Sequence, residues 1–175
     1  MTNTEFLILD FIKDNMHSPI MDKFMVFVTT LGNSGAIWII TAVLMLCTKK
    51  YRTTGVMLAL GLLLSLVIGN IILKPMIARE RPFWINDNIK IIIDAPKDFS
   101  FPSGHTLASA ISATILILRH RRIGICAAVL GVLIAFSRLY LYVHFPTDVL
   151  AGAVVGIIIG MISVKFVETV KNKKA

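Results

Sequence analysis

The amino-acid sequence predicts an all-α membrane protein, a polytopic bundle of five or six transmembrane helices with interfacial helices at its N-terminus. Of its 175 residues, 56% are hydrophobic and 16% are charged, and the mean hydropathy is +0.79. A soluble domain carries about a quarter charged residues. The basic residues lie between long uncharged runs and do not gather on one soluble face, which argues against a nucleic-acid partner. We therefore expect the bilayer to be the solvent of a single membrane domain.

Five uncharged runs predict the helices, at 24–48, 53–73, 99–118 (uncharged but for His105), 123–137 and 149–164. A helix needs about 20 apolar residues to cross the hydrocarbon core. The first run contains Gly32-Asn33-Ser34-Gly35, a turn signal that predicts a break between a helix over 19–31 and a span from 35. Within one domain of residues 1–175, we expect five spans, at 35–48, 53–74, 103–119, 122–140 and 147–168.

Residues 1–31 allow two interpretations. Asp10 and Lys13 interrupt the first short apolar stretch, and Asp22 and Lys23 lie in the second. Short apolar helices that carry charges are typical of the membrane interface, so we expect interfacial helices here. A short first span in this region, which would make six in total, is the alternative.

The distribution of basic residues predicts the orientation. The loops at 49–52 and 119–122 and the tail from residue 165 fall on one side, with ten basic residues and one acid. The opposite side carries eight basic residues and nine acids. Cytoplasmic loops are enriched in Lys and Arg, so the first side is expected in the cytoplasm. The long loop over 74–101 then faces outward.

Three polar clusters interrupt the apolar chain, and all three fall at the outward ends of predicted spans. They are the segments 74–82 (KPMIARERP), 101–105 (FPSGH) and 137–148 (SRLYLYVHFPTD). Ionisable groups at the edge of a membrane are costly and usually functional. The topology therefore predicts that the three clusters form one site on the outward face. Loops as long as the one that contains residues 84–97 also tend to be functional.

The residue types in these clusters suit a multiply charged anion. Lys74 and Arg81 are seven residues apart, so both can point the same way if the helix continues, and Arg138 adds a third cation. Arginine supplies planar bidentate donors to such anions. Ser103 and Gly104 open a predicted helix, whose free backbone N–H groups form a ready phosphate cradle.

Two histidines and an aspartate supply the chemistry. His105 and His144 can divide the roles of acid and nucleophile. Asp148 follows His144 by four residues at the start of the last helix, where Pro146 suits the first turn. The carboxylate can then orient the imidazole and stabilise its positive charge.

Each feature alone has a structural interpretation. Lys74, Arg79 and Arg81 can each be membrane-interface anchors, because long basic side chains snorkel. Ser103-Gly104 can be only a helix cap. Gly152, Gly156 and Gly160 form a helix-packing face. The joint arrangement of the clusters is what these interpretations leave unexplained.

Together, Lys74-x6-Arg81-Pro82, Pro102-Ser103-Gly104-His105 and Ser137-Arg138-x5-His144-x3-Asp148 resemble the three motifs of the type-2 phosphatidic acid phosphatase family. Vanadium-dependent haloperoxidases share this site. The resemblance implies a hydrolase that uses no cofactor and no metal. It implies that His144 forms a phosphohistidine, supported by Asp148, and that His105 protonates the leaving oxygen. The phosphate oxygens would be held by Lys74, Arg81, Ser103, Gly104 and Arg138.

The resemblance also implies a substrate in the membrane, a lipid phosphate or diphosphate. Undecaprenyl diphosphate is favoured; phosphatidylglycerol phosphate and phosphatidate are alternatives, as is transfer of the phosphoryl group to another lipid. A lipid-phosphate binder without turnover and a purely structural or transport bundle are the rival classes. We expect a multi-pass protein of the cell membrane with its active site on the extracytoplasmic face. The sequence leaves the oligomeric state open.

Overall fold

The structure, a computed structural model, describes residues 2–86 and 88–173, and all regular secondary structure in them is helical, as predicted. In chain order the elements are α1 Thr2–Met16, α2 Pro19–Leu31, the 3-10 turn η1 Asn33–Gly35, α3 Ala36–Cys47, α4 Arg52–Leu64, the π-helix η2 Ser65–Leu73, α5 Lys74–Ile77, α6 Pro82–Ile85, α7 Gly104–Arg119, α8 Arg121–Tyr140 and α9 Pro146–Asn172.

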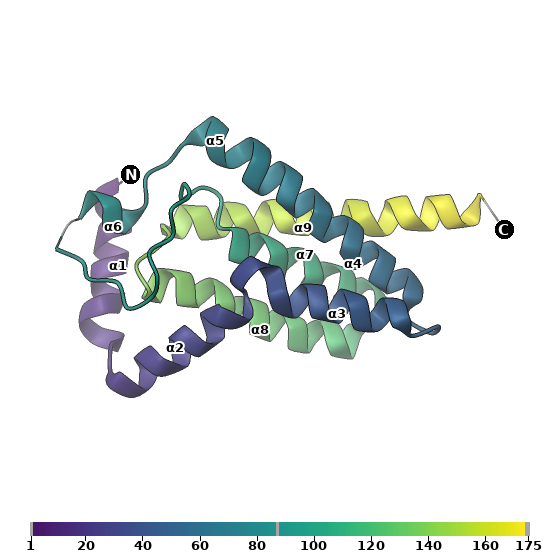
Figure 1. Cartoon of the computed structure of the whole chain (residues 1–175), viewed down its shortest axis with the longest axis horizontal. Coiled ribbons are helices and arrows are strands. Elements are labelled where there is room, and N and C mark those ends of the chain that lie inside the picture. Colours follow the sequence, from purple (N-terminus) through teal and green to yellow (C-terminus); the bar gives the residue numbers. More distant parts are fainter. Residues whose placement is uncertain (1, 87, 174–175) are drawn as a thin grey trace.

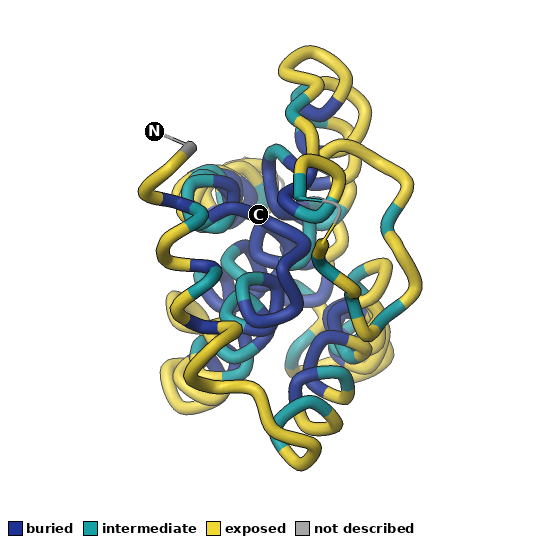
Figure 2. Tube along the Cα trace, turned by 90° about the vertical axis from the view of Figure 1, so that its left-hand side faces the viewer, coloured by how far each residue is buried: buried dark blue, intermediate teal, exposed yellow. Residues whose placement is uncertain are grey.

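Helix α7 lies at the centre of the bundle. Figure 1 shows α3, α4, α8 and α9 running alongside it, while α1 lies crosswise at one end and α2 leads from α1 towards α3. Leu107, Ile111 and Ile115 of α7 are fully buried in the main core. The outer helices instead expose large apolar side chains such as Leu44 and Val132, and Figure 2 shows this exposed layer around a buried centre. An extensive exposed apolar surface of this kind marks contact with a membrane.

The small-residue face predicted on the last helix packs α9 against α7. A Cβ atom at Gly152 would lie 2.8 Å from the backbone oxygen of Ser103, and one at Gly156 would lie 2.7 Å from the Cβ of Ala110. Glycine at these positions permits the close approach of two helix backbones. This contact brings the start of α9 against the start of α7, so the second and third polar clusters become neighbours.

Fewer helices than the five expected are long and apolar enough to be candidate membrane spans. Three segments are long and apolar enough to cross a bilayer: Arg52–Ile85, Arg121–Tyr140 and Pro146–Asn172. Pro19–Leu31 and Asn33–Cys47 reach that length only as a pair, bent by 44° at the predicted turn, where Ser34 and Gly35 have positive φ. Helix α7, with 16 residues, is a shorter apolar helix. The number of crossings, five or six, stays a prediction.

The two N-terminal helices meet in a corner that is fixed to the end of α8. The side chain of Ser18 caps α2 by accepting a hydrogen bond from the backbone N–H of Met21 (3.3 Å). His17 stacks on Tyr140 with ring centroids 4.1 Å apart, and its Nδ1 lies 3.0 Å from Oδ1 of Asp22. The hydroxyl of Tyr140 donates to the same carboxylate oxygen (2.5 Å). These contacts hold α1 across the end of the bundle that contains the polar clusters.

Candidate active site

The three polar clusters meet around one cavity of about 1190 Å³. Six of the eight predicted site residues line it: Lys74, Arg81, Gly104, His105, Arg138 and His144. The other two, Ser103 and Asp148, are fully buried behind its wall. The structure thus brings together all three segments, although more than 70 residues separate the first from the last.

Lys74 and Arg81 reach the cavity by a route that differs from the expected one. The helix does not continue between them: α5 ends before Ala78, which is left-handed (φ 48°), and Arg81 is extended (ψ 152°). Pro82 disfavours a helical conformation in the residue before it, which explains the break. The two cations instead converge on Asp98, whose Oδ2 contacts Nζ of Lys74 and whose Oδ1 lies 2.7 Å from Nη2 of Arg81.

Asp98, which lies outside the three motifs, ties the two cations together. Burial acts to raise the pKa of this carboxyl, but the hydrogen bonds and positive charges of Lys74 and Arg81 outweigh it and lower the pKa to about 2. The side chain is therefore a carboxylate at neutral pH. The segment is also held through its backbone, because Nε of Arg81 donates to the carbonyl oxygen of Asp98 (2.7 Å). Asp98 thus occupies a position where the oxygens of a bound phosphate would meet the same donors.

Arg138 enters the cavity from the last turn of α8. Its side chain is almost completely buried, and Nη1 donates to the hydroxyl of Thr29 on α2 (2.5 Å). Its Nε has no hydrogen-bond partner among residues 2–86 and 88–173. A buried guanidinium N–H without a partner is costly, so this atom favours an anion as ligand.

The two ring nitrogens of His144 face different partners. Nε2 lies 3.2 Å from Nη1 of Arg81 at the cavity, and Nδ1 lies 3.3 Å from the hydroxyl of Ser100 and 3.6 Å from Oδ2 of Asp148. Because Arg81 can only donate, Nε2 must carry the lone pair and Nδ1 the proton. Ser100 in turn donates to Oδ2 of Asp148 (2.5 Å). The hydroxyl of Ser100 therefore connects the imidazole to the carboxylate.

The environment of His144 keeps its imidazole neutral. Only 1% of the residue is exposed, and burial lowers the pKa of the imidazole to about 3. The nearby carboxylate of Asp148 opposes this effect, and the charges of Arg81 and Arg138 add to it. At neutral pH the Nε2 lone pair is therefore free of a proton. A neutral imidazole that faces a cationic cavity is a suitable nucleophile for a bound anion.

Asp148 is fixed by the start of α9. Pro146 occupies the first helical position, as predicted, and Oδ2 of Asp148 accepts a hydrogen bond from the backbone N–H of Phe145 (2.9 Å). The backbone N–H of Ser103 donates to the carbonyl oxygen of Asp148 (3.1 Å). The second and third motifs are therefore joined by a backbone hydrogen bond. This N–H of Ser103 is already engaged, whereas Gly104, the first residue of α7, lines the cavity.

His105 faces the cavity from the first turn of α7. Its Nε2 lies 3.0 Å from Oδ1 of Asn33 in the turn between α2 and α3. A Cβ atom at Gly32 would lie 2.7 Å from Cδ2 of the same ring, so glycine leaves the space that the imidazole fills. His105 from α7 and His144 from the turn between α8 and α9 thus line the same cavity.

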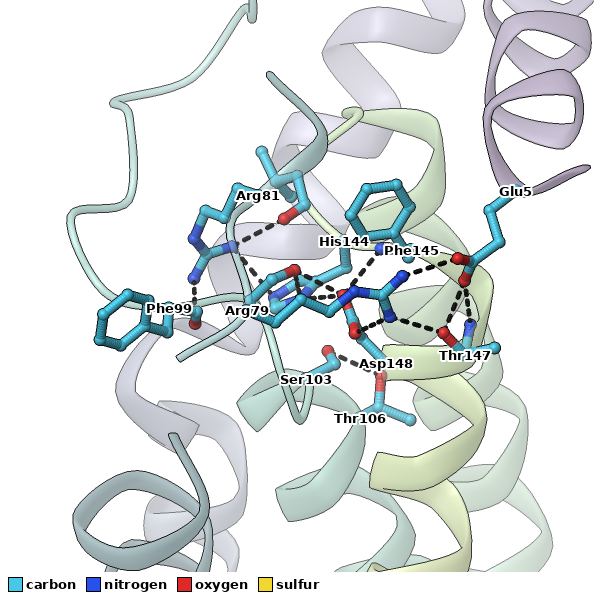
Figure 3. A network of polar contacts seen from close by, with 12 residues as sticks. Glu5, Arg79, Arg81, Phe99, Ser103, Thr106, His144, Phe145, Thr147 and Asp148 are labelled. Carbon is cyan, nitrogen blue, oxygen red and sulfur yellow. Dashed lines mark hydrogen bonds and ion pairs between the residues drawn. The ribbon is translucent and has the colours of Figure 1, made fainter. Parts of the chain in front are cut away.

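Four polar residues at the site were absent from the sequence-based prediction. Ser100 and Asp98 precede the second motif by a few residues, and their proximity to it was a usable signal. Asn33 was interpreted only as part of a turn, and Arg79 only as an interface anchor. Arg79 contacts Asp148 directly, as Figure 3 shows, and no local sequence pattern indicates that contact.

Similarity to known proteins identifies the family of this chain. Residues 54–172 match the PAP2 superfamily. The chain is 32% identical to an undecaprenyl-diphosphatase of Sulfolobus acidocaldarius, over 88% of this chain and 74% of that protein. It is 30% identical to the undecaprenyl-diphosphatase BcrC of Bacillus subtilis, over 86% and 77% of the two chains. The crystal structure of a transmembrane PAP2-type phosphatidylglycerolphosphate phosphatase from Bacillus subtilis aligns with a TM-score of 0.78 at 26% identity, over 96% of this chain and 86% of that one. The resemblance to the type-2 phosphatidic acid phosphatase family is thereby confirmed, and the chain belongs to the PAP2 superfamily.

Proposed function

We propose that this protein is a lipid phosphatase of the cell membrane that hydrolyses a lipid phosphate or diphosphate through a phosphohistidine. The orientation of His144 carries the proposal. Its unprotonated Nε2 faces the cationic cavity, 3.2 Å from Arg81, while its Nδ1 faces Ser100 and Asp148. This division of the two nitrogens is what a nucleophilic imidazole requires.

In the first step, Nε2 of His144 attacks phosphorus and forms an N–P bond while the bond from phosphorus to the leaving oxygen breaks. The imidazole becomes positively charged, and the carboxylate of Asp148 stabilises it through the Nδ1 proton. The electron pair of the broken bond stays on the leaving oxygen. His105 in its protonated form, which a bound anion favours, donates a proton to that oxygen.

The cations supply most of the transition-state stabilisation. Phosphoryl transfer depends chiefly on positioning and on neutralising charge at the equatorial oxygens. Lys74, Arg81 and Arg138 all line the cavity, and the first amides of α7 lie beside them at Gly104. Ser103 supports this region from behind, through its hydrogen bonds to Asp148 and Thr106. These residues hold the phosphate without any role for a metal ion in the proposed steps.

In the second step, water attacks the phosphohistidine. His105 accepts a proton from this water, the N–P bond breaks, and its electron pair returns to Nε2 of His144. The products are inorganic phosphate and the enzyme in its initial protonation state. Release of phosphate to water distinguishes this hydrolase from a transferase, which would pass the phosphoryl group to a lipid acceptor.

The walls of the cavity support a lipid substrate. Beyond the cations, apolar side chains from α3, α4 and η2 line it, among them Ile39, Leu62 and Leu66. Undecaprenyl diphosphate is the favoured substrate, because two relatives with that activity in their names align over most of this chain. Phosphatidylglycerol phosphate is the specific alternative, supported by the alignment with a phosphatase of that lipid.

A substrate panel in detergent tests the proposal. Phosphate release from undecaprenyl diphosphate, phosphatidylglycerol phosphate and phosphatidate is measured in EDTA for the wild type, His144→Ala and His105→Ala. We expect activity without added metal, loss of activity and of the acid-labile phosphoenzyme in His144→Ala, and inhibition by vanadate, which adopts the geometry of the transition state. Activity that requires Mg²⁺, or that survives in His144→Ala, contradicts the mechanism.

The extracytoplasmic location of the site needs its own test. Lys90 is exposed in the loop beside the cavity. In a Cys47→Ser/Cys126→Ser background, Lys90→Cys is expected to react with a membrane-impermeant maleimide added to intact cells. Protection in intact cells together with labelling after lysis would place the site in the cytoplasm.

A further inference from the structure

Arg79 occupies one of the unspecified positions of the first motif, and its guanidinium contacts the buried carboxylate of Asp148. Nη1 donates to Oδ1 of Asp148 (2.7 Å) and to the hydroxyl of Thr147 (2.6 Å), and Nη2 donates to Oε2 of Glu5 (2.6 Å). The guanidinium also lies 4.0 Å from the ring centroid of Phe145. Figure 3 shows Arg79 between Glu5 on one side and Asp148 on the other. A snorkelling anchor would extend into the interface, and this side chain does not.

The contacts of Asp148 are divided between its two oxygens. Oδ2 accepts from Ser100 (2.5 Å) and from the backbone of Phe145 (2.9 Å), and it is the oxygen nearest Nδ1 of His144. Oδ1 is the oxygen that accepts from Arg79. Arg79 therefore fixes one of the two oxygens and, together with Ser100 and Phe145 at the other, sets the rotation of the carboxylate group. A rotation would move Oδ2 away from Ser100 and His144.

Burial makes the charge of Arg79 necessary as well. Asp148 is 0% exposed, and an isolated carboxylate in such a place is strongly destabilised unless a cation is paired with it. Arg79 is that cation in a direct contact, since the nearest nitrogen of His144 lies 3.6 Å away and is neutral. The ion pair places a positive charge in contact with Asp148 before the imidazole becomes positive.

Glu5 provides the second half of the arrangement, from the distant helix α1. The side chain of Glu5 is buried; its Oε2 accepts from Arg79, and its Oε1 accepts from the hydroxyl of Thr147 (2.5 Å). Glu5 shares the positive charge of Arg79, so the three side chains together carry one negative charge.

We infer that Arg79 is a positioning residue for Asp148, and that Glu5 on α1 holds Arg79 in place, so docking of the N-terminal helix completes the catalytic group. The inference rests on the proposed function, because it assigns Asp148 to the support of His144. It also explains why α1 crosses the end of the bundle that holds the cavity. A purely structural role for the same contacts would fix α1 without any effect on the chemical step.

The test uses Arg79→Gln, Arg79→Lys, Glu5→Gln and the double variant Glu5→Gln/Arg79→Gln in the full chain. We expect Arg79→Gln to lower kcat by about tenfold or more, as for loss of a charge-assisted hydrogen bond, with KM changed by less than about twofold. Arg79→Lys keeps the charge and is expected to recover part of kcat. Glu5→Gln alone is expected to lower kcat by about threefold relative to the wild type. In the Arg79→Gln background the same substitution is expected to lower kcat by less than about twofold, because Glu5 acts through Arg79.

Arg119→Gln is the matched control. Arg119 forms a more exposed Arg–Glu pair with Glu168 (2.5 Å) at the opposite end of α7, far from His105, so its loss is expected to leave kcat unchanged. Thermal unfolding in detergent is measured for every variant, and rates are normalised to folded protein. If Arg79→Gln does not fold, Glu5→Gln and Arg79→Lys decide the question by the same kcat criterion.

Unchanged kcat in the folded variants, or an effect confined to KM or to stability, would overturn the inference. His144→Ala, assayed in the same series, separates this failure from a failure of the proposed function. If His144→Ala is inactive while the Arg79 and Glu5 variants behave as wild type, only the positioning role is wrong. If His144→Ala is active, the proposed function itself is wrong.

Discussion

Ser100 offers a sharp test of how the site is assembled, because its hydroxyl connects the nucleophile to its carboxylate. The hydroxyl lies 3.3 Å from Nδ1 of His144 and donates to Oδ2 of Asp148 at 2.5 Å, whereas the direct distance from Nδ1 to Oδ2 is 3.6 Å. The residue is completely buried, so water cannot replace the hydroxyl without rearrangement. The substitution Ser100→Ala removes the oxygen and leaves the backbone in place.

The expected magnitude follows from the bond that is lost. A hydrogen bond to a charged group contributes about 1.5–3 kcal/mol, and each ~1.4 kcal/mol in the activation barrier changes a rate about tenfold. Ser100→Ala is therefore expected to lower kcat by roughly 10- to 150-fold. KM is expected to change little, since Ser100 does not line the cavity that binds the phosphate.

The assay measures steady-state phosphate release together with the rate of phosphoenzyme formation in a rapid quench. Ser112→Ala is the matched control, because Ser112 is also a buried serine, and its hydroxyl has no hydrogen-bond partner in the described part of the chain. Ser112→Ala is expected to retain the wild-type kcat. A Ser100→Ala variant that folds and keeps kcat within twofold would refute the reasoning and show that His144 contacts Asp148 directly.

Three further predictions concern charge and packing. Burial lowers the pKa of His144 to about 3, so its imidazole is expected to stay neutral as the pH falls from 7 to about 4. The ¹⁵N chemical shifts of labelled histidine report its protonation state. Protonation of His144 near pH 6.5 would contradict this prediction. Asp98→Asn removes a carboxylate that competes with phosphate oxygens for Lys74 and Arg81, so vanadate is expected to inhibit several-fold more strongly. Asp94→Asn, at another carboxylate that lines the cavity, is the control. Weaker inhibition of Asp98→Asn would mean that Asp98 chiefly orients the two cations. Gly156→Ala places a Cβ 2.7 Å from a backbone oxygen of α7 and is expected to destabilise the protein by about 1–3 kcal/mol. The measurement is a lower Tm in detergent. Val154→Ala, at an exposed position of the same helix, is expected to have little effect.

Local sequence was sufficient for the helical fold, and it pointed to six residues that the structure places around one cavity. Long uncharged runs require helices in a bilayer, because each backbone group must be satisfied within its own segment. The glycines at 152, 156 and 160 indicated the packing face of the last helix, and Pro146 indicated where that helix begins. His144 and Asp148, four residues apart, indicated their own partnership. These features depend on spacing over a few neighbouring residues, which a sequence displays directly.

Only the tertiary structure decided which charges act together. Lys74 and Arg81 meet at Asp98 even though the helix between them breaks. The two side chains therefore lie together as predicted, but a continuous helix with seven-residue spacing is not the cause. Arg79 is indistinguishable in sequence from an interface anchor, and its partner Glu5 lies 74 positions away. The physical reason is that an ion pair in a buried site is selected by where separate helices cross, and this depends on packing between distant segments that no local pattern encodes.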